Sequence, residues 1–476
     1  MSREIYPMEE KYQEYLTDES KNQGSAVSIS FPESEEEIQE IMETLGKENI
    51  PVTIQGSMTG IVGGSVPVGG HIMNLQKMKR IEAYTDNDGP TVTLEPGVSL
   101  EELEQGINRN FKGKGYFWPP SPTETTASIG GVLATAARGI NIAYYEDTRK
   151  YVSEIHLVDG MGKLHILDKS SLDTVIGSEG LYGVITKATL LLEKKPEENW
   201  GITFFFEELA QVNDFVNGIE EIEDTPFGYI VAMEYVDRAS IDLVESKKEF
   251  MTKIKELPDV EPEFNHLLYI EIGGKEDAIT QIAEKLMELV IQCDGNPDKA
   301  WAVMGEAEIQ RMRAFHHSVA ECTNLFIEEA RRNDDRITKL ESDMALPGLS
   351  LKECVEFYTE AAKANNIDIT IFGHVEGRYL HANILPKNYD EYERGRRLLS
   401  FWNQKAYKKY KKITVEHGIG KVKSDLAGCI FTKDQIAQIE EQKRKYDPNR
   451  LLNRGNIFSE DAYDKDCSVY EAGSGL

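Results

Sequence analysis

The chain has 476 residues, a hydrophobic content of 40% and a formal net charge of −29. This length is enough for two or three domains with buried cores. The negative charge argues against nucleic-acid binding, because phosphate contacts need clustered lysine and arginine side chains. The cysteines are few, scattered and without a CxxC pair: Cys293, Cys322, Cys354, Cys429 and Cys467. We therefore expect reduced thiols and no cysteine-ligated iron–sulfur cluster on this chain.

We expect no targeting or membrane segment in this sequence. The first residues carry no apolar signal core, and no apolar run reaches the roughly 18 residues that a transmembrane helix requires. We therefore expect a cytoplasmic protein.

The first part of the chain alternates short strands, helices and glycine-rich loops. Residues 1–30 are polar and predict a helical N-terminal segment. Helices are predicted after the cap residues Ser34 and Ser99 and from Ser128. The predicted strands lie at 51–55, 71–75, within 91–97, at 151–158 and 163–167, and within 176–192.

The composition changes near Pro196, after which amphipathic helices alternate with strands such as 267–272. This pattern predicts a second, α+β domain. The acidic tail after Phe458 is expected to be loose. We predict four regions: an N-terminal segment 1–30, a first domain 31–196, a second domain 197–425, and a C-terminal segment 426–476 that packs on the first domain.

A glycine-rich loop follows the strand at 51–55 and reads Gly56-Ser-Met-Thr-Gly-Ile-Val-Gly-Gly-Ser65. Successive small residues allow backbone N–H groups to converge on an anion. The loop lacks both the GxGxxG pattern and a Walker lysine, so any dinucleotide site is of another kind. Three further small-residue clusters follow at 119–123, 128–131 and 177–180, and each allows close backbone approach to a flat or charged ligand.

Two histidines, His374 and His381, lie seven positions apart in a run that alternates like a strand. On one straight strand this odd separation places them on opposite faces, unless Gly377 allows a turn or bulge between them. In a helix both would lie on one face. Glu416 and His417 follow downstream. Two imidazoles, a carboxylate and a spare histidine can hold a divalent metal with an open position and place a base beside it.

These motifs, taken in order, resemble a known family. The series Gly-Ser-x-Thr-Gly, Pro-Pro-x-Pro-Thr, Ser-Ile-Gly-Gly and Gly-Ser-Glu-Gly resembles the vanillyl-alcohol-oxidase/PCMH flavoprotein superfamily. The segments Gly373-His374, Leu380-His-Ala-Asn383, Glu416-His-Gly-Ile-Gly420 and Tyr446-Asp-Pro-Asn-Arg-Leu-Leu-Asn453 resemble its glycolate oxidase/D-lactate dehydrogenase branch. The implied fold class is α+β: a two-subdomain PCMH-type FAD-binding domain, an α+β cap domain with an antiparallel sheet, and a C-terminal helical segment that returns to the FAD domain.

The resemblance implies non-covalent FAD, because the first loop carries no histidine for a flavin link. The pyrophosphate contacts that it implies are Gly56, Ser57, Thr59 and Gly60. The other implied FAD contacts are Pro120, Thr123, Ser128, Gly130, Gly131, Thr135, Gly180 and Ile185, with Asn453 near the isoalloxazine.

The resemblance also implies a divalent metal, Zn, Fe or Mn, on His374, His381 and Glu416. His417 matches the family's proposed base and Asn383 a substrate contact. The implied partner of the substrate carboxylate is Arg313, because an arginine fork suits that group; Arg311 and Arg378 are competitors.

This sequence departs from the family pattern in two places near these residues. The usual His-x-Gly-Asp-Gly-Asn-Leu-His is replaced by His374-Val-Glu-Gly-Arg-Tyr-Leu-His381. The usual Lys-x-Asp reads Glu341-Ser-Asp343, with Lys339 two positions earlier. We expect these departures to affect the choice of substrate more than the chemistry.

The sequence therefore predicts an FAD-dependent dehydrogenase that oxidises a small D-2-hydroxy acid, with D-lactate as the first candidate. In this hypothesis His417 takes the hydroxyl proton while the C2 hydride moves to flavin N5. A second hypothesis makes the chain the flavoprotein subunit of a larger complex, with an electron-transfer flavoprotein or an iron–sulfur protein as partner. A third, a binding protein without flavin, conflicts with the intact loops and ligand residues.

Overall fold

The computed structural model describes residues 5–87, 89–120, 122–222 and 227–459. Ser121, Cys467 and the acidic tail from residue 460 lie outside these residues. The chain divides into two compact units. Unit 1 contains the described residues of Met1–Gly139, Asp147–Lys195 and His417–Leu476, and unit 2 contains those of Ile140–Glu146 and Pro196–Glu416. The chain thus returns to unit 1 at His417, whereas the sequence places that boundary near 426.

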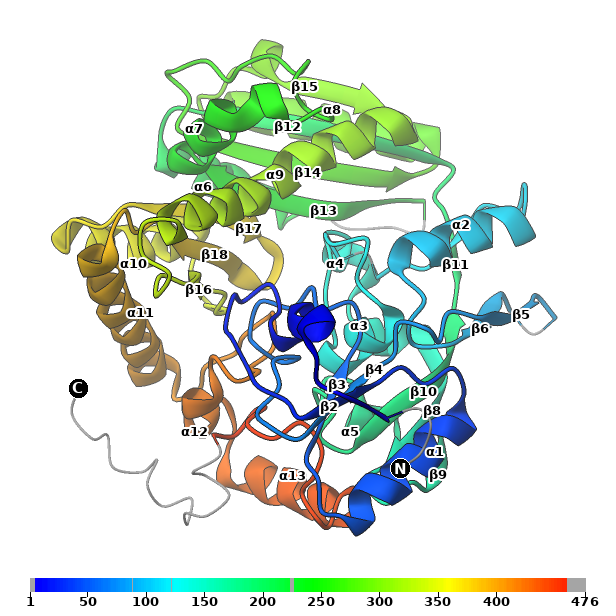
Figure 1. Ribbon diagram of the computed structural model, residues 1–476. Helices are drawn as coiled ribbons and strands as arrows, with labels where there is room; N and C mark the ends of the chain where they lie inside the picture. Colours follow the sequence, from blue (N-terminus) through cyan, green and yellow to red (C-terminus); the bar gives the residue numbers. More distant parts are fainter. Residues whose placement is uncertain (1–4, 88, 121, 223–226, 460–476) are drawn as a thin grey trace. The chain divides into compact units, whose positions relative to one another are not determined.

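Unit 1 is built on three sheets (Figure 1). The first has the order β1-β2-β4-β3, in which β4 is parallel to both β2 and β3: β1 Ile5–Pro7, β2 Ser28–Ser30, β3 Val52–Gln55 and β4 His71–Asn74. The second is antiparallel with the order β5-β6-β10-β8-β9: β5 Ile81–Thr85, β6 Thr91–Leu94, β8 Val152–Asp159, β9 Leu164–Asp168 and β10 Gly183–Leu191. The third pairs β7 Tyr116–Phe117 with β11 Glu193–Lys194.

The helices of unit 1 begin where the cap residues predict. Ser34 and Ser128 each accept a hydrogen bond from a backbone N–H of the first turn, and Ser99 forms a reciprocal capping box with Glu102. The helices are α1 Glu35–Lys47, α2 Leu100–Asn110, α3 Ile129–Thr135, α5 Leu172–Val175, α12 Ala427–Ile430 and α13 Lys433–Tyr446. The N-terminal prediction is only partly met, because residues 5–30 form two strands around a 3-10 helix, Glu10–Leu16.

The C-terminal segment is part of the unit 1 core. Leu452 is buried in the same apolar cluster as Ile41 of α1 and Val184 of β10. The Lys443 ammonium is also buried and donates to the carbonyl oxygens of Leu181 and Leu452 at 2.8 and 2.9 Å. Because buried amines are stable only with such partners, these bonds fasten α13 to the strands of unit 1.

Unit 2 is built on one antiparallel sheet of seven strands with the order β15-β12-β14-β13-β17-β18-β16 (Figure 1). The strands are β12 Glu198–Phe206, β13 Gly228–Asp237, β14 His266–Gly274, β15 Trp301–Met304, β16 Leu340–Ser342, β17 Ile369–His374 and β18 Tyr379–Ile384. Its helices are α4 Ile142–Tyr145, α6 Leu209–Ile219, α7 Arg238–Lys247, α8 Glu276–Gln292, α9 Glu306–Arg331, α10 Leu351–Ala364 and α11 Tyr389–Tyr410.

Both faces of this sheet are covered, which explains why its strands read as apolar runs rather than as alternating patterns. Phe204 and Phe206 contact Phe215 of α6, with ring centroids 4.9 and 5.2 Å apart. Phe205 points to the other face, where it joins a core cluster with residues of α7 and α9 such as Phe315. The polar cluster described below lies on this α9 face.

The mixed architecture, with its antiparallel cap sheet, confirms the predicted α+β class. Among the described residues, no helix is both long enough and apolar enough to span a bilayer.

Candidate active site

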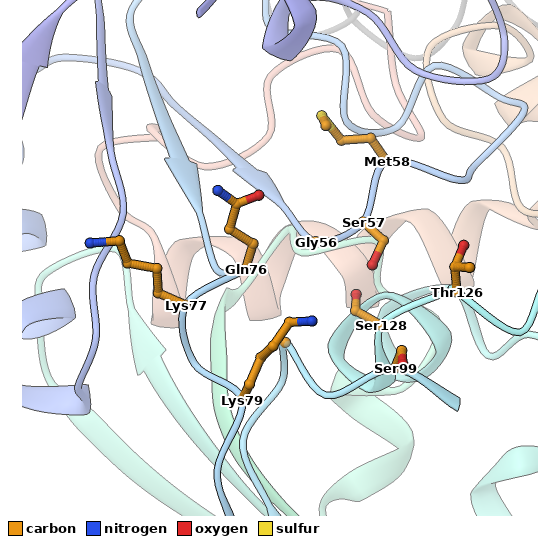
Figure 2. A pocket seen from close by; sticks show the side chains of 10 residues that line it. Gly56, Ser57, Met58, Gln76, Lys77, Lys79, Ser99, Thr126 and Ser128 are labelled. Atoms are coloured by element: carbon orange, nitrogen blue, oxygen red, sulfur yellow. The ribbon is translucent and has the colours of Figure 1, made fainter. Parts of the chain in front are cut away.

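A cavity of about 670 Å³ opens beside the glycine-rich loop of unit 1 (Figure 2). Its lining residues come from the loop, from the segment after β4 and from the starts of α2 and α3: Gly56, Ser57, Met58, Gln76, Lys77, Lys79, Gly97, Ser99, Thr126 and Ser128. Gly56, Ser57 and Ser128 are among the predicted cofactor contacts. Lys77 and Lys79 were not predicted, although they are the cationic side chains of this lining. Figure 2 shows Lys79 extending toward Ser128 and Ser99.

The residues of this cavity fit the diphosphate part of FAD. A Cβ added at Gly56 would lie 2.1 Å from the Ser128 hydroxyl, so only glycine allows the loop to meet the start of α3. A Cβ at Gly60 would meet no atom within 4 Å, which leaves room beside the loop backbone. A lysine, several hydroxyl groups and exposed backbone amides are the groups that bind diphosphates.

The other predicted FAD contacts lie in the same unit, outside this lining. Thr135 donates its hydroxyl to the Gly131 carbonyl at 2.9 Å, and Ile185 is buried in β10. Gly130 packs on Pro96, since an added Cβ would lie 2.6 Å from that ring. Thr59, Pro120 and Thr123 lie on loops.

Asn453 uses its amide within the chain. Its Oδ1 accepts from the Ile54 backbone at 2.8 Å, and its Nδ2 donates to the Glu179 carbonyl at 2.7 Å. Gly180, with a φ of +72°, packs directly against this amide. Asn453 therefore connects β3, which leads into the glycine-rich loop, to the Gly177–Gly180 loop.

Glu179 holds the loop that carries His417. Its buried carboxylate accepts hydrogen bonds from the backbone N–H groups of Ile419 and Gly420 at 2.6 and 2.7 Å. Burial raises the pKa of Glu179, although these two amides oppose the shift. Gly418 has a φ of +84°, and a Cβ there would lie 2.9 Å from the Glu179 carboxylate. The Glu-His-Gly-Ile-Gly motif therefore needs its first glycine in order to fit against this side chain.

In unit 2, a hairpin brings His374 and His381 onto one face. His374 ends β17 opposite Tyr379, and His381 lies two residues beyond Tyr379 on β18. Gly377, with a φ of +66°, lies in the connecting turn. Cross-strand partners share a face, as do residues two apart, so the turn at Gly377 allows the odd spacing. The ring centroids are 6.1 Å apart.

Glu416 completes a cluster with the two histidines. Its carboxylate oxygens lie 3.2 Å from His374 Nε2 and 3.6 Å from His381 Nε2. One ligand atom from each of the three buried residues lies within 4.8 Å of the others. The backbone holds Glu416 in place, because its N–H donates to Asp343 Oδ2 at 3.1 Å.

Further carboxylates contact the outer nitrogens of both histidines. His374 Nδ1 hydrogen-bonds Glu234, and His381 Nδ1 lies 3.3 Å from Glu341. Burial alone would raise the pKa of Glu234, but the charges of His374 and of His316, 3.0 Å away, bring that pKa to about 2. Burial alone would lower the pKa of His374, but Glu234 and Glu416 hold it well above its usual value.

This donor set fits a divalent cation. Three carboxylates contact the histidine pair: Glu234 and Glu416 are buried, and the side chain of Glu341 is 8% exposed and paired with Lys339 at 2.9 Å. A dication would neutralise the negative excess that such burial otherwise makes costly. Two imidazoles and a carboxylate suit Zn²⁺, Fe²⁺ or Mn²⁺.

Asn383 lies two residues beyond His381 on β18 and so shares its face of the sheet. It is buried, yet neither its Oδ1 nor its Nδ2 has a hydrogen-bond partner among the described residues. Buried amides are normally satisfied, so this side chain is suited to receive a ligand.

The three candidate arginines are in different environments. Arg313 on α9 is largely buried and binds Glu271 with Nε and Nη2, and Nη2 also donates to Asn141 at 3.0 Å. Among the described residues, these hydrogen bonds of Arg313 come from Nε and Nη2, and Nη1 makes none of them. Arg378 donates all its nitrogens within unit 2, to the Leu349 and Val375 carbonyls and to a glutamate.

Arg311 is more exposed than the other two and pairs with Glu308, one helical turn before it, at 3.1 Å. Of the three, Arg313 therefore remains the one suited to bind substrate, but only through one side of its guanidinium.

The buried carboxylates Glu234 and Glu271, and His316 beside Glu234, were not predicted. His316 and His317 lie side by side on α9 and are both largely buried, and burial brings the pKa of His317 to about 3. The signal for the carboxylates is present in the sequence: Glu234 interrupts an apolar run in β13, and Glu271 interrupts one in β14.

Comparison with known proteins is consistent with this geometry. Residues 28–168 match the FAD binding domain family, and residues 196–457 match the C-terminal domain of FAD linked oxidases. A D-lactate dehydrogenase of Anaerostipes hadrus is 28% identical over 89% of this chain and 88% of its own length. The glycolate oxidase subunit GlcD of Bacillus subtilis is 26% identical, over 91% of this chain and 89% of its own.

A D-2-hydroxyglutarate dehydrogenase of Stutzerimonas stutzeri is 24% identical over 94% of both chains. Among solved structures, an alkyldihydroxyacetonephosphate synthase matches with a TM-score of 0.68 at 15% identity, over 95% of this chain and 82% of its own. This likeness concerns the fold. The chain therefore belongs to the FAD-linked oxidases, and it is an FAD-dependent oxidoreductase.

Proposed function

We propose that this oxidoreductase acts on a small D-2-hydroxy acid, with D-lactate as the preferred substrate, and converts it to the 2-oxo acid. The observation that carries the proposal is the polar face of unit 2, where His374, His381 and Glu416 form a cluster. Asn383 lies two residues beyond His381 on β18, and its side-chain amide has no hydrogen-bond partner among the described residues. The relatives described above are dehydrogenases or oxidases whose names specify 2-hydroxy acids.

Each candidate site residue has a defined role in this proposal. His374, His381 and Glu416 hold the cation, and Asn383 hydrogen-bonds the substrate. Arg313 binds the substrate carboxylate through Nη1. Bound FAD supplies the two-electron acceptor, and the bound cation supplies Lewis acidity toward the 2-hydroxyl.

His417 is the proposed base. It directly follows Glu416, in a loop that Glu179 holds through two backbone amides. In the reaction it takes the proton of the 2-hydroxyl. The hydrogen on C2 leaves the substrate with both electrons of its bond, as a hydride, and the C–O bond becomes a carbonyl. One proton and one hydride are thereby removed, which balances the oxidation of a hydroxy acid to an oxo acid.

The charges in unit 2 favour a monocarboxylate such as lactate over a dicarboxylate. Glu271 already neutralises Arg313, and Arg378 is fully engaged within the fold. Lys339 is paired with Glu341, and Glu341 occupies the position at which the family pattern has a lysine. A second substrate carboxylate would therefore add negative charge beside Glu341 with no cation of this set to receive it.

The test is anaerobic reduction of the bound flavin by D-lactate, L-lactate, glycolate, D-malate and D-2-hydroxyglutarate. We expect bleaching by D-lactate at the lowest concentration, with D-malate and D-2-hydroxyglutarate weaker. His417→Ala should retain FAD and lose reduction. Bleaching by none of the five acids would reject the proposed function, and normal reduction of His417→Ala would reject the base.

We further propose that electrons leave through a separate acceptor protein. The described cysteines are isolated thiols, Cys293, Cys322, Cys354 and Cys429, and one relative is named as a subunit of glycolate oxidase. Gel filtration of the native protein tests this proposal, and we expect a redox protein to elute with the chain. A chain that elutes alone, and whose reduced flavin is reoxidised by oxygen as fast as it is reduced by substrate, would contradict the proposal.

A further inference from the structure

The two ligand histidines share an orientation that the cluster alone does not require. Each imidazole turns Nε2 toward Glu416 and Nδ1 toward a separate carboxylate: His374 Nδ1 hydrogen-bonds Glu234, and His381 Nδ1 lies 3.3 Å from Glu341 in a close polar contact rather than a hydrogen bond. An imidazole that ligates a metal through Nε2 needs its proton on Nδ1, and a carboxylate acceptor at Nδ1 selects that tautomer.

We propose that Glu234 and Glu341 are positioning residues that fix the tautomer and ring orientation of His374 and His381 for cation binding. This inference rests on the proposed function, which includes the cation. It assigns a role to two carboxylates that the hydroxy-acid chemistry itself does not use.

Sheet register builds the first of these contacts. Glu234 of β13 lies directly opposite His374 of β17 in the antiparallel ladder, so both side chains point to the α9 face. Figure 1 shows β13, β17 and β18 as neighbours in the sheet. His316 of α9 lies 3.0 Å from the second oxygen of Glu234. Glu234 is thus held between a helix and a strand.

Sheet register also builds the second contact. Glu341 of β16 is the ladder partner of Asn383, two residues beyond His381 on β18. Its carboxylate lies 3.3 Å from His381 Nδ1 and 2.9 Å from the Lys339 ammonium. Each backing carboxylate therefore has a basic group on its other side, which limits its rotation.

A third buried carboxylate provides a matched control. Glu271 lies on β14, next to β13, and is as buried as Glu234. It pairs with Arg313 rather than with a ligand histidine. Glu271→Gln therefore disturbs a buried ion pair in the same sheet without touching either imidazole.

The experiment measures Zn²⁺ affinity of the FAD-loaded protein after chelator treatment, by calorimetry in competition with a chelator of known affinity. Loss of such an outer carboxylate typically weakens metal binding by about 10- to 100-fold. We expect that loss for Glu234→Gln and for Glu341→Gln, and partial recovery in Glu234→Asp. Glu271→Gln should bind Zn²⁺ like the wild type.

The outcomes separate the two proposals. Unchanged affinity in both Glu234→Gln and Glu341→Gln, with a wild type that binds one Zn²⁺ per chain, would overturn the positioning roles and leave the proposed function standing. Equal losses in Glu271→Gln would show a general loss of structure and would also overturn them. A wild type that binds no Zn²⁺, Mn²⁺ or Fe²⁺ would reject the cation itself.

Discussion

Replacing Glu179 by glutamine should slow reduction of the flavin without removing it. The Glu179 carboxylate accepts from Ile419 and Gly420 and so holds the loop that begins at His417. Glutamine keeps one carbonyl oxygen, but its NH₂ group then faces the second backbone N–H. The loop loses one charge-assisted hydrogen bond and retains an unsatisfied buried donor.

The magnitude follows from these two contacts. A hydrogen bond to a charged group contributes about 1.5–3 kcal/mol, and a buried unpaired donor costs a similar amount. Burial raises the pKa of Glu179, so the charged side chain itself carries a desolvation cost that glutamine avoids. A net loss of about 2 kcal/mol lowers the population of the ordered loop, and hence the reduction rate, roughly 30-fold.

The assay is anaerobic stopped-flow reduction by D-lactate, combined with FAD content and thermal unfolding. Asp159→Asn is the control, because Asp159 is also a buried carboxylate of unit 1 that accepts two backbone amides, from Met161 and Lys163. Both variants should lose stability, but only Glu179→Gln should lose reduction rate. Equal reduction rates in the two variants would refute the role of Glu179 in holding the His417 loop.

Three further predictions concern single residues. Gly60→Ala should weaken FAD binding, measured by flavin fluorescence, and leave the thermal stability of the apoprotein unchanged. The added Cβ meets no protein atom within 4 Å and enters the space beside the loop. Unchanged FAD affinity would count against FAD binding in that space. Arg313→Met should lower the free energy of unfolding, measured in urea, by about 3–5 kcal/mol because Glu271 then lies buried without its partner. Arg311→Met should have little effect, because Arg311 is more exposed. Similar losses in the two variants would contradict this difference in burial between the two arginines. Burial raises the pKa of Asp237 from 3.8 to about 6, so the native state binds more protons than the unfolded state between these pH values and its stability falls as pH rises through them. Asp237→Asn, which retains the helix cap, should therefore raise the free energy of unfolding by up to about 3 kcal/mol at pH 8 and by nothing near pH 3. An equal gain at both pH values would exclude titration of Asp237 as the cause.

Local signals in the sequence predicted the elements that form the FAD unit. Ser34, Ser99 and Ser128 cap helices as expected, since capping depends on a few neighbouring residues. The N-terminal segment was less predictable. Its residues join a sheet with β4 through β2, and such a distant pairing leaves no periodic signal in a short polar stretch.

The cluster of His374, His381 and Glu416 was predictable in its members but not in its surroundings. The spacing of His374 and His381 admitted a hairpin, because Gly377 can adopt positive φ. The partners Glu234 and Glu341 reach the histidines only through the order of the seven-stranded sheet, in which β13 lies beside β17 and β16 beside β18. Strand order is set by long-range packing, so the sequence of a single strand does not contain it.

The same reason explains why the surroundings of Arg313 were not predicted. The sequence offered Arg313 as a candidate for the substrate carboxylate, but its pairing with Glu271 depends on the packing of α9 across β14. That pairing changes the chemistry expected of the arginine, because it leaves one side of the guanidinium for a substrate.

The most direct test uses protein that keeps FAD while its cation is removed by a chelator. Under anaerobic conditions D-lactate should bleach the flavin of the cation-loaded protein, fail to bleach the stripped protein, and bleach it again after Zn²⁺ or Mn²⁺ is restored. Equal bleaching before and after stripping would contradict the central claim that His374, His381 and Glu416 hold a cation that the oxidation requires.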